Sequence, residues 1–155
     1  MTKTTQARKH AIGLAGEFLV AGELLRRGIL AAVTYGNAKK ADVVAFHEGR
    51  SVSIEVKSTS EAKWVIGGTL PQETRSLWAL VHLPRDLKQP PQYFILTSAE
   101  LRQAILPRHD AYMTSYLAKH GTHYVGTGVV SVLRKELDDL HHGAWDKVLQ
   151  GLGIS

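Results

Sequence analysis

Asp42, Glu55 and Lys57 have the clearest chemical potential in this sequence, because a β-hairpin would bring them together. Asp42 begins one apolar run, Glu55 and Lys57 lie in the next, and the turn signal Glu48-Gly49 separates the two runs. If the residues beside the turn pair with each other, the register places Asp42 directly opposite Glu55. Opposite residues have Cβ atoms about 4.5–5.5 Å apart, and side chains two positions apart share a face. The sequence therefore predicts two carboxylates and a lysine at one point of a sheet.

This grouping has a chemical interpretation and a structural alternative. Two carboxylates directly opposite each other repel, and a divalent cation between them would remove that penalty. Mg²⁺ prefers oxygen ligands and is usually held by one or two carboxylates. Lys57 would then lie beside an attacking water, where it could direct or lose a proton, or offset charge on a phosphate. In the alternative, this face is solvated and Glu55 and Lys57 only pair with each other.

A fourth candidate, Glu17, lies in a predicted helix over residues 7–27. Apolar positions recur there at helical spacing, and Gly28 follows a basic last turn. Glu17 falls within the apolar face, with Gly13 and Gly16 reducing the bulk beside it. A carboxylate on an apolar stripe needs a partner. Either a metal site supplies that partner, or Glu17 lies at the edge of the stripe and bonds to a nearby Arg or Lys.

Polar and basic residues around the hairpin are candidates for contacts to nucleic acid. The loop before Asp42 ends in two lysines that would lie near phosphate oxygens, although surface lysines also serve solubility alone. Further candidates come directly after the lysine of the hairpin and from the polar segment 70–76, whose direction the sequence does not fix. The set comprises Lys39, Lys40, Ser58, Gln72 and Arg75.

The order of these residues resembles that of the PD-(D/E)xK nucleases, the restriction-endonuclease-like superfamily that includes Holliday junction resolvases and repair endonucleases. The pattern is an Asp, a spacer, and then (D/E)-x-K in a strand, here Asp42 followed by Glu55-Val56-Lys57. Many members have a Glu on the preceding helix, where Glu17 stands. Ala41 occupies the position of the Pro in the superfamily's name, which varies among members. The resemblance covers about residues 10–66.

The resemblance implies an α/β fold, which the sequence pattern also favours. We expect a central mixed sheet of about five strands, with the Glu17 helix on one side and C-terminal helices on the other side or at the edge. By resemblance, Asp42 and Glu55 would bind Mg²⁺ or Mn²⁺ together with the Val56 carbonyl. Glu17 would complete a second ion site or hold a water, and Lys57 would act on the attacking water. The implied function is metal-dependent endonuclease cleavage of DNA, structure-specific or repair-related, by a protein that could act as a homodimer for symmetric cutting.

The composition of the chain limits which functions and locations are compatible with the sequence. The 155 residues fit one domain, 1–155, with a formal charge of +5 and a pI near 9.6 that suit an anionic partner. The absence of cysteine excludes a disulfide framework and a thiolate zinc site. No apolar run reaches membrane-spanning length, so we expect no membrane partner and a cytoplasmic location. Two other classes stay open, namely a non-catalytic nucleic-acid-binding module and an assembly protein whose hairpin carboxylates pair with lysines.

The rest of the chain is predicted to form the strands and helices that surround the hairpin. An edge strand is expected at 29–33, before the hairpin, and further strands at 64–66, 78–83 and 93–96. A capping box at Thr97 and Glu100 predicts a helix to about residue 106. A second helix over 110–120, an extended segment at 124–133 and a closing helix over 137–149 with Trp145 in the core complete the expected order. The C-terminal histidines are expected to lie on the surface or to pack, because adjacent residues such as His141 and His142 face apart.

Overall fold

The computed structural model describes residues 5–35, 41–125 and 128–155 and shows an α/β fold. Its centre is a mixed five-stranded sheet of order β1-β2-β3-β5-β6. Strands β3 and β5 are parallel, and the other neighbours are antiparallel. The strands are β1 (Leu30–Val33), β2 (Val43–His47), β3 (Arg50–Thr59), β5 (Leu77–His82) and β6 (Gln92–Thr97). The expected fold class and sheet size are confirmed.

The predicted hairpin forms in the predicted register. Val43 pairs with Ile54 and His47 pairs with Arg50, across a turn in which Glu48 and Gly49 have φ values of 45° and 78°. Two consecutive left-handed residues are typical of a type I′ turn, whose twist matches that of the strands it joins. The predicted inner face is buried, and it comprises Val43, Ala45, Val52, Ile54 and Val56.

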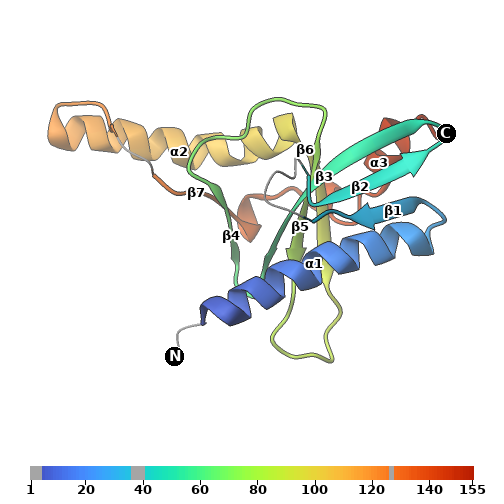
Figure 1. The fold of residues 1–155 in the computed structure, drawn as a ribbon. Coiled ribbons are helices and arrows are strands. Elements are labelled where there is room, and N and C mark those ends of the chain that lie inside the picture. Colours follow the sequence, from blue (N-terminus) through green and yellow to red (C-terminus); the bar gives the residue numbers. More distant parts are fainter. Residues whose placement is uncertain (1–4, 36–40, 126–127) are drawn as a thin grey trace.

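Helix α1 (Gln6–Arg26) packs on this apolar face and approaches β3 closely (Figure 1). Its N-terminus is capped by Thr5, whose side chain accepts a hydrogen bond from the Arg8 N–H. A Cβ atom at Gly16 would lie 1.6 Å from the Ser58 Oγ. Glycine at this position is therefore what lets the helix and the strand meet.

The opposite face of the sheet carries a second, two-stranded sheet and one long helix. Strands β4 (Lys63–Gly67) and β7 (Val130–Leu133) pair antiparallel, so only the last part of the expected extended segment 124–133 is a strand. Helix α2 (Ser98–His120) replaces the two helices expected at 97–106 and 110–120, and it extends well beyond the sheet in Figure 1. The capping box is confirmed, and the helix continues through Pro107.

The single closing helix expected over 137–149 is wrong. Two 3₁₀ turns, η1 (Arg134–Glu136) and η2 (Asp139–His141), precede the short helix α3 (Asp146–Gly151). Gly143, with a φ of 65°, breaks the helical path between them. Trp145 is buried as expected, and the Arg27 guanidinium lies 4.7 Å from its ring centroid. This contact places α3 on the same face of the sheet as α1.

Lys147 fixes α3 to the start of α2. Its Nζ donates to the Glu100 carboxylate at 2.8 Å and to the Ile95 carbonyl at 2.9 Å, and lies 3.0 Å from the His141 Nδ1. Burial lowers the pKa of His141, and the positive charge of Lys147 lowers it further. Burial alone would raise the pKa of Glu100, but hydrogen bonds from Lys147 and Thr97 outweigh it, so that this pKa is lowered. None of the helices in the described part of the chain is long and apolar enough to span a membrane.

Candidate active site and the groove beside it

Asp42 is held rigidly at the point where the hairpin ladder ends. It directly precedes β2, it is only 8 % exposed, and its N–H donates to the Ile54 carbonyl at 3.1 Å. The Val56 N–H donates to the Asp42 Oδ2 at 2.8 Å. Strand β3 continues beyond Val43, the first residue of β2. The Asp42 carboxylate therefore accepts the Val56 N–H, which has no backbone acceptor on β2. The Asp42 carbonyl in turn accepts from the Thr34 N–H at 2.9 Å.

Strand β3 presents Glu55 and Lys57 on the face opposite α1. Their positions alternate with the buried Ile54 and Val56, and in the parallel register Glu55 pairs with Trp78 and Lys57 with Leu80. The ladder ends at the Val43–Ile54 pair, so the predicted pairing of Asp42 with Glu55 lies one residue beyond it and stays a prediction. The N–H and C=O of one strand residue point to the same side. The Val56 carbonyl therefore points toward Asp42, on the side of β3 where its N–H is already bound.

Glu17 lies on the sheet-facing side of α1, one position after the buried Gly16. Its side chain is partly covered and its Oε2 atom is buried. The helical spacing thus places this carboxylate at the junction of helix and sheet, as the apolar pattern indicated.

The donor chemistry of the hairpin fits a hard divalent cation. Two carboxylates and a main-chain carbonyl are oxygen ligands, and a carboxylate that accepts one backbone hydrogen bond retains capacity for further partners. Within the residues that the structure describes, no three His, Cys, Asp or Glu side chains come together in a group that could hold a metal ion. A Mg²⁺ site needs only one or two carboxylates, with water filling the remaining positions. The ligand and catalytic roles of Asp42, Glu55, Val56, Glu17 and Lys57 stay predictions.

A groove of about 390 Å³ begins at Lys57, and we call it the basic groove. Its walls come from the start of α1, the end of β3, the start of β4 and the loop after β5. Five cationic side chains line it, with Glu61 as the acid, and Glu61 pairs with the groove's Arg85. The five are Arg8, Lys9, Lys57, Lys63 and Arg85. Such a concentration of positive charge suits a phosphate backbone.

The residues predicted to contact nucleic acid lie in different parts of the structure. Lys39 and Lys40 lie outside the described residues. Ser58 lines the basic groove, but its hydroxyl oxygen is buried against Gly16. Gln72 and Arg75 are exposed on the loop between β4 and β5. These assignments also stay predictions.

Sequence reasoning missed four of the five cations of the groove. They are Arg8, Lys9, Lys63 and Arg85, and they come from three segments that are distant in sequence. Only the Arg8-Lys9 pair at the start of the predicted helix offered a local signal. The histidines behave as expected where described, with the His142 ring 5.2 Å from that of Phe94.

Two solved structures are similar to this chain, each at 15 % sequence identity. The bacterial homing endonuclease I-Ssp6803I has a TM-score of 0.50, over 96 % of this chain and 94 % of that chain. Hjc, a Holliday junction resolvase from Archaeoglobus fulgidus, has a TM-score of 0.44, over 80 % of this chain and 90 % of that chain. The chain has the restriction-endonuclease-like fold. The likeness at this level of identity concerns the fold. No protein-family description and no curated protein matches the sequence.

Proposed function

We propose that this protein is a metal-dependent endonuclease that hydrolyses phosphodiester bonds of DNA, with a structure-specific or repair-type substrate. The observation that supports this most is the position of Lys57. It shares a face of β3 with Glu55, on either side of Val56, whose N–H donates to the anchored Asp42, and it also lines the basic groove. A phosphate held in the groove would thus lie beside the acidic hairpin.

The alternative of a polar hairpin face without chemistry explains this arrangement less well. Asp42 is almost fully buried, and burying a carboxylate is unfavourable unless it is hydrogen-bonded or paired. An asparagine would accept the Val56 N–H equally well without a charge. In the proposal, the negative charge of Asp42 has a further use as a ligand of the cation.

In the proposed reaction, Asp42, Glu55 and the Val56 carbonyl would hold Mg²⁺ or Mn²⁺, with Glu17 holding a second ion or a water. When bound, the cation supplies charge stabilisation to the phosphate and makes water a stronger acid. Lys57 orients the attacking water or accepts its proton, and offsets charge that develops on the phosphate oxygens. The water oxygen forms a bond to phosphorus, one P–O bond to a neighbouring sugar breaks, and the leaving oxygen takes up a proton.

The test is cleavage of labelled linear duplex, single strand, flap and four-way junction, each with Mg²⁺ or Mn²⁺. We expect metal-dependent cutting that falls by about 10²–10³-fold in Glu55→Gln and in Lys57→Met, because each removes a group that acts on the transition state. Arg26→Ala is the matched control, since this exposed cation lies at the far end of α1 from the groove. It should cut at the wild-type rate.

Two results would contradict the proposal. One is an absence of cutting on every substrate together with an absence of Mg²⁺ or Mn²⁺ binding by calorimetry. Salt-sensitive DNA binding would then favour a non-catalytic binding module, and no DNA binding would leave an assembly role. The other is full activity in Glu55→Gln. Sedimentation with and without DNA tests the predicted homodimer.

A further inference from the structure

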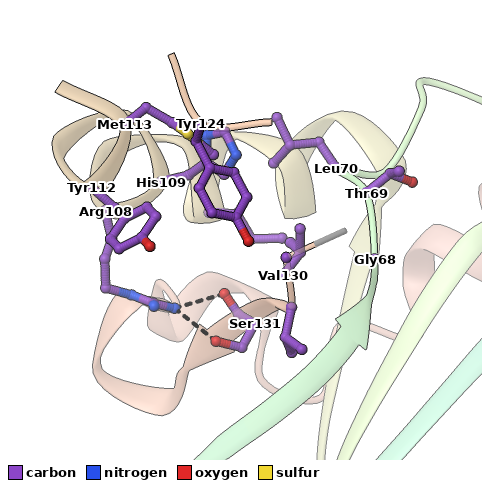
Figure 2. Close-up of a pocket in the computed structure, with 13 residues that line it drawn as sticks. Gly68, Thr69, Leu70, Arg108, His109, Tyr112, Met113, Tyr124, Val130 and Ser131 are labelled. Atoms are coloured by element: carbon purple, nitrogen blue, oxygen red, sulfur yellow. Dashed lines mark hydrogen bonds between the residues drawn. The ribbon is translucent and has the colours of Figure 1, made fainter. Parts of the chain in front are cut away.

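A second cavity, of about 660 Å³, lies between α2 and the segments that follow β4 and precede β7. We call it the α2 pocket. Figure 2 shows Tyr124 between Tyr112 of α2 and the wall formed by Leu70 and Val130. Its volume falls in the range of pockets that bind small organic groups, roughly 300–1,000 Å³, and its lining combines apolar side chains with a few polar ones.

The rings on one side of the α2 pocket form a cluster. Tyr112 and Tyr124 lie edge to face with centroids 6.0 Å apart, and Tyr116 lies edge to face with Tyr124 at 5.1 Å. Tyr112 is 54 % exposed, so its ring has surface to offer a ligand. Aromatic faces of this kind stack on nucleobases irrespective of base identity.

Arg108 fixes the floor of the α2 pocket. Its guanidinium donates to the Ser131 carbonyl at 2.6 Å (Figure 2). It also donates to the Glu136 carboxylate, so Arg108 joins α2 to β7 and η1. The rings of α2 are thereby held at a set distance from the sheet. The pocket is thus formed before any ligand enters.

The α2 pocket and the basic groove both border the β4–β7 ladder. Val65 lines the groove and Ser131 lines the pocket, and these two residues are partners in the β4–β7 ladder. Partners in an antiparallel ladder point to the same face. Lys63 lines the groove and Gly68 lines the pocket, and the two residues are five positions apart in the chain. Extended chain of that length covers roughly 16 Å at 3.3 Å per residue, which is about five nucleotide steps at 3.4 Å.

We propose that the α2 pocket receives an unstacked base of the DNA strand whose phosphates lie in the basic groove. The inference rests on the proposed function in taking DNA as the ligand, and it adds that unpaired nucleotides near the cut are recognised. The occupant follows from the rings, the positive charge of the groove and the shared β4–β7 face. The competing account is a purely structural cluster that ties Tyr124 and residues 128–131 to α2.

The test measures binding in EDTA, where cleavage does not occur. The probes are a labelled blunt duplex, the same duplex with a short single-stranded extension, and that extension with abasic sites. Tyr112→Ala should weaken binding of the extended DNA by roughly 5- to 150-fold, the equivalent of 1–3 kcal/mol per stacked base. Binding of the blunt duplex should stay unchanged, and abasic sites should abolish the difference between wild type and variant.

Two variants separate recognition from folding. Tyr112→Phe keeps the ring and should bind all three DNAs as the wild type does. Phe46→Ala removes an exposed ring at the opposite end of the sheet, on β2, and should also change nothing. Equal losses on blunt and extended DNA in Tyr112→Ala, or no loss on extended DNA, would overturn the proposal, as would a wild type that binds no DNA. Binding as expected without cleavage in Mg²⁺ would instead remove the endonuclease assignment alone.

Discussion

At the scale of single residues, Asp42 has a structural role as well as the proposed chemical one. Its carboxylate accepts the hydrogen bond of the Val56 N–H, in a buried position. We expect Asp42→Ala to lower the free energy of unfolding by about 1–3 kcal/mol, because it leaves that donor without its acceptor. Asp42→Asn keeps an acceptor oxygen and should unfold close to wild type in urea.

The two substitutions should nevertheless agree in activity. Both remove the negative charge, so both should reduce metal-dependent cleavage by about 10²–10³-fold. Cleavage near the wild-type rate in a stably folded Asp42→Asn would mean that the charge of Asp42 serves no catalytic purpose. Asparagine is thus the informative substitution, since alanine changes fold and chemistry together.

At the scale of elements, the packing of α1 on β3 depends on Gly16. An added methyl group would overlap the Ser58 hydroxyl, so Gly16→Ala should force the helix away from the strand and destabilise the protein by about 1–3 kcal/mol. Gly13 is the matched control on the same helix, because a Cβ there meets nothing within 4 Å. Gly13→Ala should raise the free energy of unfolding by up to about 1 kcal/mol, through helix propensity alone.

The measurement for this pair is urea unfolding followed by circular dichroism. Equal effects of the two alanines would contradict close packing at Gly16. A double variant, Gly16→Ala with Ser58→Gly, should recover part of the loss, because it removes the side chain that the new methyl group meets.

Elements with local signals could be predicted, and those decided by distant contacts could not. The hairpin follows from alternation and a two-residue turn, both visible within residues 42–57. The sequence predicts two helices where the structure has the single helix α2, which continues through Pro107 although proline cannot donate a helical hydrogen bond. The structure holds the helix together through contacts on either side, with Leu101 and Ile105 buried and Arg108 bonded to Glu136 and Ser131. The pairing of β4 with β7 joins residues 63–67 to 130–133, and no local pattern encodes it.

The candidate site divides in the same way. Asp42, Glu55 and Lys57 lie in or beside one hairpin, whose register from Val43 to His47 could be predicted from the local sequence. The basic groove and the α2 pocket combine segments from both halves of the chain, and neither could be predicted without the fold.

At the scale of the whole molecule, the groove predicts how DNA binding responds to salt. Each phosphate contact adds about 0.9 to the slope of log K against log salt concentration for duplex DNA. The double variant Arg8→Ala, Lys9→Ala should therefore lower the slope by about two and weaken binding without regard to sequence. Fluorescence anisotropy over a salt series checks this. Arg26→Ala should keep the wild-type slope, and an unchanged slope in the double variant would place the DNA elsewhere.

The two-residue turn of the β2–β3 hairpin also bears on how the protein folds. Hairpins close in about 1–10 μs, and a short loop loses little entropy on closure, whereas α1 and the loop after β5 approach from distant parts of the chain. Asp42 and Glu55 therefore meet while the sheet is still incomplete. We therefore expect repulsion between these two carboxylates to slow this early step of folding.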